Sequence, residues 1–439
     1  MFSFECCNPL WGRTVNPHND AYTCGGSSGG EAALLALDGA VFGVGSDIGG
    51  SLRIPTGYCG IYALKPTAGR LSLTGTRSPS SGDSGIQVTM GPMGRSVDDL
   101  VLFCKSLFGR PDGFADYKLI PTPFRDAELP KRLRFGYYTS DGYTKSSPAN
   151  QRAVIETVEA LKKQGHECIE IADFNYATEA TAIFLGLTSS DGYRKLTSHL
   201  GPDPMEKSIW LPVYGSRLPS LVRSVAAWIV ESVLGDSKFV TFLRAARTKS
   251  FREWSDFSVK RDQFIQGFYD KARFKSLQDS LRVSDSPVHL KGLASTPVGW
   301  HHRSRSVTTS NASWTGRSRR GVAQLNSIAS STILYNLVDS PVGVIPATFV
   351  DPSKDALTKE WTQCGPDAGS VLMHNFMYKD KTGKYYNPEA MKGMPVGIQI
   401  IGKRFEDEKV LAMMDVVDNA LGKERGFGPG SLLEKSSQA

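Results

Sequence analysis

Hydrophobic and polar positions near the start of the chain predict a short helix followed by a short strand. Residues 31–37 are rich in Ala and Leu and are apolar nearly all round, which is typical of a buried helix. Residues 40–44 form a short apolar run that predicts a buried strand. Two glycine-framed serine clusters, at residues 25–30 and 49–51, flank this unit, so we expect the fold to bring them together.

The same kind of patterning continues to the end of the chain. At residues 149–164 the apolar side chains Val154, Val158 and Leu161 recur at helical spacing. Strands are expected on either side of that helix, and this β–α–β order favours an α/β layer architecture. The elements expected are helices at 97–107, 149–164, 328–338 and 406–421, strands at 133–138, 166–171, 342–346 and 394–402, and a mostly helical region at 174–274.

Residues 281–320 break the pattern. They hold seven Lys or Arg, a single acid at Asp285 and eight serines, with no clear helical or strand periodicity. Such a basic, serine-rich run is typical of a disordered, solvated linker. We interpret it as an aberrant insert from a translated intron or a shifted reading frame, with nucleic-acid binding as a minor alternative.

Composition narrows the function classes. The 439 residues are 40% apolar, enough for a large core, and the net charge of +7 comes from scattered basic residues, which does not indicate a nucleic-acid partner. No apolar run approaches 18 residues, so we expect no membrane span. The seven cysteines include no metal-type Cys-x₂-Cys pair, so we expect reduced thiols in the cytoplasm, no metal and no cofactor.

The serine clusters are the candidate chemistry. Glycines beside a serine let the backbone approach a substrate closely and free N–H groups for a substrate oxygen, which favours nucleophilic acyl transfer. A nucleophile elbow is an alternative, because Gly25-x-Ser27-x-Gly29 fits G-x-S-x-G, although residues 16–23 are polar and turn-like where a strand is needed. A nucleotide-binding loop of the form G-x-G-x-x-G is excluded, because Gly43-x-Gly45 would need a third glycine at position 48, where the chain has Ile48.

These motifs closely resemble the amidase signature family of serine hydrolases. The match rests on GGSSGGE at residues 25–31 and GSDIGGSLRIP at residues 45–55. Glu31 and the sequence of residues 48–55 are most similar to those of fungal acetamidases and fatty-acid amide hydrolases. The resemblance covers about 8–275 and 325–425. It implies one α/β/α domain over residues 1–429 around a twisted mixed sheet, with a polar tail at 430–439.

The resemblance also implies roles for the site residues. Ser51 would be the acylated nucleophile, and Ser27, on a cis peptide bond, would relay its proton. The backbone N–H groups of Ile48, Gly49, Gly50 and Ser51 would form the oxyanion hole, where preorganised donors stabilise the developing charge. Supporting positions are Ser28, Asp47 and Arg53. We expect Asp47 to orient the loop and Arg53 to pair with it, and a surface ion pair is the alternative for these two residues.

The family's catalytic lysine has no counterpart at the expected place. The family puts it well before the bridging serine, whereas the first lysine of this chain is Lys65. Lys65 lies in a segment that has a structural role in the family, so substitution by it is a minor alternative. We therefore expect an N-terminally truncated chain, or a member without the usual base.

The implied function is hydrolysis of a small-molecule carboxylic amide. The alternatives are a catalytically inactive family member and an α/β-hydrolase-type esterase that uses Ser27 or Ser28. Acetamide, aryl amides and fatty-acid amides all remain candidate substrates, and a homodimer is the candidate assembly.

Overall fold

The computed structural model describes most of the chain. The described residues are 4–78, 85–110, 116, 118–172, 174–206, 209–281, 305–309, 329–365, 369–379 and 385–432, with the backbone alone described at 271–281 and 305–309.

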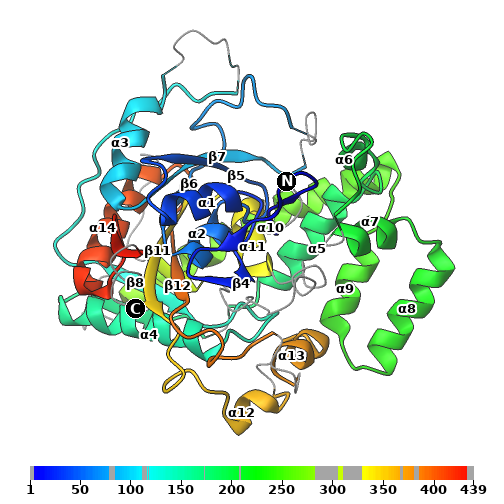
Figure 1. Cartoon of the computed structure of the whole chain (residues 1–439). Helices are drawn as coiled ribbons and strands as arrows, with labels where there is room; N and C mark the ends of the chain where they lie inside the picture. The colour runs from blue at the N-terminus through cyan, green and yellow to red at the C-terminus, as the bar shows by residue number, and fades with distance from the viewer. Residues whose placement is uncertain are drawn as a thin grey trace, which may run out of the picture.

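An eight-stranded mixed sheet forms the centre of the molecule (Figure 1). The strands β8 and β9 pair in parallel, as do β8 and β10, and the other neighbours are antiparallel. Across the sheet the order is β5 (Gly43–Asp47), β7 (Thr89–Gly94), β6 (Tyr62–Lys65), β11 (Val342–Phe349), β12 (Pro395–Ile401), β10 (Arg305–Thr309), β8 (Arg134–Tyr138) and β9 (Glu167–Glu170).

Helices cover both faces of this sheet, which confirms the predicted α/β/α layers. On one face lie α3 (Val97–Leu107), α4 (Pro148–Lys163) and α14 (Asp407–Leu421), and on the other α1 (Gly29–Ala36) and α2 (Arg53–Cys59). The strands β11 and β12 touch both layers: a Cβ added to Gly343 would collide with Met414 of α14, and one added to Gly397 would lie 3.0 Å from Gly57 of α2. Close approach of helices to the sheet therefore requires glycine at these two positions.

Local signals explain where the covering helices begin. Ser96 accepts a hydrogen bond from the N–H of Asp99 at 3.1 Å, and the Asp99 carboxylate accepts one from the N–H of Ser96 at 3.0 Å, so α3 opens on a capping box. The helix α4 opens with Pro148 after the cap Ser147 and buries Val154, Val158 and Leu161, the face that its periodicity predicts.

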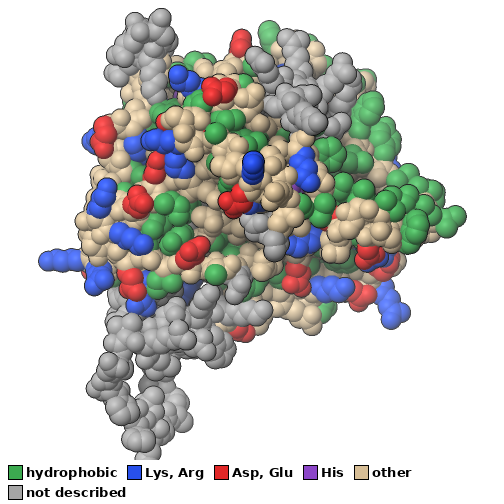
Figure 2. Space-filling model, turned by 90° about the horizontal axis from the view of Figure 1, so that it is seen from below, with side chains coloured by type: hydrophobic (Ala, Val, Ile, Leu, Met, Phe, Trp, Pro, Cys, Tyr) green, Lys and Arg blue, Asp and Glu red, His purple; other side chains and the backbone are tan. Residues whose placement is uncertain are grey.

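A helical region extends from one side of the sheet, as predicted for 174–274. It consists of α5 (Ala177–Thr188), α6 (Arg194–Ser198), α7 (Trp210–Ser216), α8 (Ser220–Ser232), α9 (Ser237–Ala245) and α10 (Phe251–Leu281). Hydrophobic side chains gather on the surface at this edge of the molecule (Figure 2). Within the described residues no helix has both the length and the hydropathy that a membrane crossing requires.

Short elements complete the chain. Two antiparallel ribbons precede α1: β1 (Cys7–Asn8) with β2 (Gly12–Arg13), and β3 (Val15–Asn16) with β4 (Asn19–Thr23). Later come α11 (Ser330–Leu337), α12 (Lys359–Thr362), α13 (Val371–Tyr378) and a 3-10 helix at Lys423–Arg425.

The structure differs from the sequence analysis in three elements. The strand expected at 40–44 runs over Gly43–Asp47 and lies at the sheet edge, where Val44 is exposed. The segment 16–23, expected to be turn-like, holds β4. Within 281–320, where no strand was expected, residues 305–309 form β10 between β12 and β8; residues 282–304 and 310–328 lie outside the described part of the chain, and so does most of the predicted tail.

Candidate active site

The two serine clusters meet in the fold. The backbone N–H of Ser28 donates to the carbonyl oxygen of Ser51 at 3.0 Å, and the Ser28 hydroxyl accepts from the N–H of Ser46 at 3.3 Å. The helix α1 begins immediately after Ser28, while β5 ends at Asp47 and leads into the second cluster. The helix–strand unit predicted from the sequence therefore brings the two serine clusters into one site.

The two serines differ in their surroundings. Ser51 is buried, whereas Ser27 is partly exposed, and the Gly26–Ser27 peptide bond is cis, the form that the family resemblance implies. Their roles as nucleophile and relay remain predictions.

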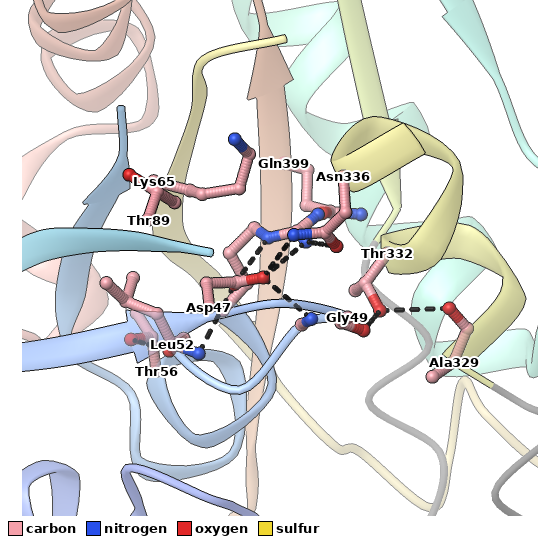
Figure 3. A network of polar contacts seen from close by, with 12 residues as sticks. Asp47, Gly49, Leu52, Thr56, Lys65, Thr89, Ala329, Thr332, Asn336 and Gln399 are labelled. Carbon is pink, nitrogen blue, oxygen red and sulfur yellow. Dashed lines mark hydrogen bonds and ion pairs between the residues drawn. The ribbon is translucent and has the colours of Figure 1, made fainter. Parts of the chain in front are cut away.

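Asp47 organises the loop that carries Ser51 (Figure 3). Its carboxylate accepts hydrogen bonds from the N–H groups of Gly50 at 2.8 Å and Leu52 at 3.3 Å. Arg53 adds two charged bonds, from Nε at 2.9 Å and Nη2 at 3.0 Å. One side chain thus binds the backbone N–H groups on both sides of the predicted nucleophile and the side chain of Arg53.

The Asp47–Arg53 pair is fully buried, not a surface pair. Burial alone would raise the pKa of Asp47, but the charge of Arg53 and its hydrogen bonds outweigh burial and hold the pKa at about 2. The carboxylate is therefore ionised at neutral pH, and it can accept all of its hydrogen bonds at once.

Two further partners of this pair come from distant parts of the chain, and the sequence analysis missed them. Asn336 of α11 donates to Asp47 at 2.7 Å and accepts from Arg53 at 2.7 Å. Gln399 of β12 accepts from Arg53 at 3.1 Å. A polar residue inside an otherwise apolar predicted helix or strand was the signal available for both, since buried polar groups need partners.

A third missed residue, Thr332, contacts the loop directly. Its hydroxyl lies 2.6 Å from the carbonyl oxygen of Gly49 and 2.9 Å from that of Ala329, so its one proton is closest to Gly49 (Figure 3). Thr332 and Asn336 are four residues apart on α11, which places them on the same side of that helix.

The predicted oxyanion donors are not equivalent. The Gly50 N–H is engaged by Asp47, so in this conformation it is not free for a substrate oxygen. The N–H groups of Ile48, Gly49 and Ser51 have no hydrogen-bond acceptor within the described residues. In this conformation three of the four predicted donors have no acceptor among the described residues, and the role of the four as an oxyanion hole stays a prediction.

Lys65 lies apart from the hydrogen bonds that join Asp47, Arg53 and Asn336. It is buried in β6, and its Nζ donates to the carbonyl oxygen of Pro66 at 3.0 Å. In Figure 3 its ammonium end points away from Asp47. Burial lowers the pKa of Lys65, but its one hydrogen bond goes to backbone and not to either serine.

In the described part of the chain, no three His, Cys, Asp or Glu side chains are grouped so that they could hold a metal ion. The site is thus a serine loop with free backbone amides and a buried ion pair behind it.

Comparisons with known proteins agree with this geometry. A family model described as Amidase matches residues 1–258. Among curated proteins, fatty-acid amide hydrolase 1 of Sus scrofa is 28% identical over 430 residues, covering 97% of this chain and 67% of the relative. The acetamidase of Emericella nidulans is 27% identical over 430 residues, covering 95% and 66%.

Solved structures give the same result. A fatty acid amide hydrolase superposes with a TM-score of 0.72 at 26% identity, covering 96% of this chain and 63% of the other. A bacterial aryl acylamidase of the amidase signature family, at 16% identity and a TM-score of 0.54, shares the fold. The chain spans about two thirds of the length of these relatives.

Proposed function

The chain belongs to the amidase family, and from this membership we propose that it hydrolyses a carboxylic amide to an acid and ammonia or an amine. The observation that carries the proposal is the meeting of the two serine clusters, with Ser28 bonded to Ser51 and free amides beside Ser51. Relatives named as acetamidases and fatty-acid amide hydrolases support the reaction class.

In the proposed reaction the Ser51 hydroxyl oxygen attacks the amide carbonyl carbon. Its proton passes to the Ser27 hydroxyl, which gives up its own proton to a base. The carbonyl oxygen becomes an oxyanion held by the N–H groups of Ile48, Gly49 and Ser51. The C–N bond then breaks as the nitrogen takes a proton, and water releases the acid from the acyl-serine. The family resemblance implies that this base is a lysine, and Lys65 does not take the role in this conformation, because its Nζ donates to the carbonyl oxygen of Pro66 and not to either serine.

The test is the intact mass after treatment with a serine-reactive fluorophosphonate, followed by peptide mapping. We expect one adduct, on Ser51, that disappears in Ser51→Ala and persists in Ser106→Ala, a control on the surface of α3. An adduct on another residue contradicts the proposal. Without any adduct, labelling restored by an N-terminally extended chain would favour the inactive, truncated family member.

The esterase alternative has one observation in its favour. The strand β4 precedes the Gly25-x-Ser27-x-Gly29 motif and α1 follows it, which is the strand–turn–helix order of a nucleophile elbow. However, among the described residues β4 pairs with β3 in a two-stranded sheet that is separate from the central sheet. Full ester hydrolysis by Ser51→Ala, with none by Ser27→Ala or Ser28→Ala, would establish the esterase.

The substrate class, assembly and compartment complete the proposal. We propose a small-molecule amide as substrate, to be identified by turnover of acetamide, an aryl amide and a fatty-acid amide under the same conditions. A homodimer is proposed as the assembly. The cytoplasm is proposed as the compartment, since the seven cysteines are all unpaired in the structure.

A further inference from the structure

The peptide unit between Gly49 and Gly50 lies next to the predicted nucleophile. Glycine lacks a Cβ, so a Gly–Gly peptide can rotate with little steric resistance. Gly50 also adopts φ +122°, a region in which other residues are strained, and a Cβ there would collide with the Thr332 hydroxyl. The backbone beside Ser51 is therefore built from residues that do not fix their own orientation.

Two hydrogen bonds hold this peptide from opposite sides. At one end the Gly49 carbonyl oxygen accepts from the Thr332 hydroxyl at 2.6 Å. At the other end the Gly50 N–H donates to Asp47 at 2.8 Å, and Asp47 is itself held by Asn336 at 2.7 Å. All of these residues are buried, so water does not replace a lost bond easily.

We propose that Thr332 and Asn336 of α11 are positioning residues that fix the Gly49–Gly50 peptide, and with it the amide donors on either side. This inference rests on the proposed function of the loop. The N–H groups of Gly49 and Ser51 belong to the two peptides that flank this one. Rotation of the middle peptide changes ψ of Gly49 and φ of Gly50, the torsions that join it to those two peptides, so the two donors would no longer be held in one fixed orientation.

By this proposal, α11 influences catalysis at the serine loop, although α11 and the serines lie far apart along the chain. Neither α11 residue touches the reacting atoms in the mechanism above. Their effect is on the orientation of donors that act only when the oxyanion forms, so their loss lowers kcat more than it changes KM.

The variants for the test are Thr332→Val, which keeps the shape and removes the hydroxyl, and Thr332→Ser, which restores it. The matched control is Thr157→Val on α4, because the buried Thr157 hydroxyl donates to the carbonyl oxygen of Ala153 at 2.7 Å, and α4 covers the face of the sheet opposite to α2, which follows Ser51. Both Val variants lose one buried hydroxyl-to-carbonyl bond, which gives a common baseline for stability.

The first measurement is amide hydrogen exchange of the peptide that spans residues 48–52. We expect Thr332→Val to speed this exchange by about tenfold or more, and Thr332→Ser and Thr157→Val to leave it near the wild-type rate. The second measurement is turnover of the best amide substrate. We expect Thr332→Val to lower kcat by about 10- to 100-fold with KM within about twofold, and Thr332→Ser to recover most of the loss.

The two measurements separate the outcomes. Unchanged exchange in Thr332→Val overturns the positioning role whether or not the protein turns over amides. Faster exchange with an unchanged kcat overturns the catalytic part of the inference. If wild type and Ser51→Ala are equally inactive on every amide, the proposed function fails, and the exchange result still decides whether Thr332 orders the loop.

Discussion

Asp47 is a fully buried carboxylate that keeps its charge because Arg53 lies against it. A buried ion pair adds little net stability compared with apolar residues, yet removal of one partner leaves a buried charge without compensation. The sequence predicted the pairing of these two residues because they are six positions apart in one motif. It did not predict Asn336 or Gln399 as partners, since a polar residue in an apolar segment signals only that a partner is needed, and which partner it meets depends on the completed sheet.

The first prediction concerns Asp47→Asn. We expect a loss of about 3–5 kcal/mol in unfolding free energy, since the buried Arg53 charge would be left uncompensated, together with loss of fluorophosphonate labelling at Ser51. Urea unfolding and peptide mapping measure the two effects. Asp355→Asn is the control, because Asp355 is equally buried and bonds Arg152 at 2.8 Å away from the serines; it should lose stability and keep labelling.

The pH dependence of this pair follows from the same residues. The pKa of Asp47 is about 2 in the folded chain, below its ordinary value of 3.8. Its stabilising contribution is therefore present above pH 3.8 and is lost as the pH falls toward 2. Less loss of stability in Asp47→Asn at pH 2 than at pH 7 would agree with this, and an equal loss at both would contradict it.

At the scale of elements, strand β10 shows what periodicity leaves out. Residues 305–309 carry a basic and polar sequence, and yet their backbone lies between β12 and β8. The position between β12 and β8 offers N–H and C=O groups on both sides, and the β-branched residues Val307, Thr308 and Thr309 favour an extended backbone there. By contrast, α3 and α4 were predictable because their caps and apolar faces are local.

A proline in β10 tests that assignment. Val307 pairs with Tyr137 of β8 and with Ile400 of β12, so Val307→Pro removes an N–H from the middle of the sheet. We expect a loss of about 1–3 kcal/mol in unfolding free energy, from a carbonyl left unpaired. Val307→Thr keeps the N–H, so it should lose less stability than Val307→Pro. If both variants match wild type in thermal unfolding, residue 307 is not part of the sheet.

At the scale of the whole molecule, the helices α7 and α8 present apolar side chains outward. In α8, Leu221, Val225 and Trp228 are exposed at helical spacing, and of its residues Ala227 alone is buried. Hydrophobic side chains gather at this edge of the surface in Figure 2. An apolar face of this kind is uncommon on a protein with no partner, because its exposure to water is unfavourable. It is the candidate face for the proposed homodimer.

The proposed homodimer is tested by measuring molar mass with light scattering after size-exclusion chromatography. We expect wild type to have the mass of two chains, and Leu221→Lys combined with Trp228→Lys to have the mass of one. Leu102→Lys, at an exposed position on α3, should leave the dimer intact. A wild-type mass of one chain would remove the homodimer from the proposal.

The strand order has a consequence for the chain as it is synthesised. The strand β6 pairs with β11, and the polar partners of Asp47 and Arg53 come from α11 and β12. During synthesis the ribosome adds both serines roughly three hundred residues before it reaches those elements. Domains fold as their segments leave the ribosome. A nascent chain therefore holds Ser51, the proposed nucleophile, on an unfinished loop until α11 and β12 have been added.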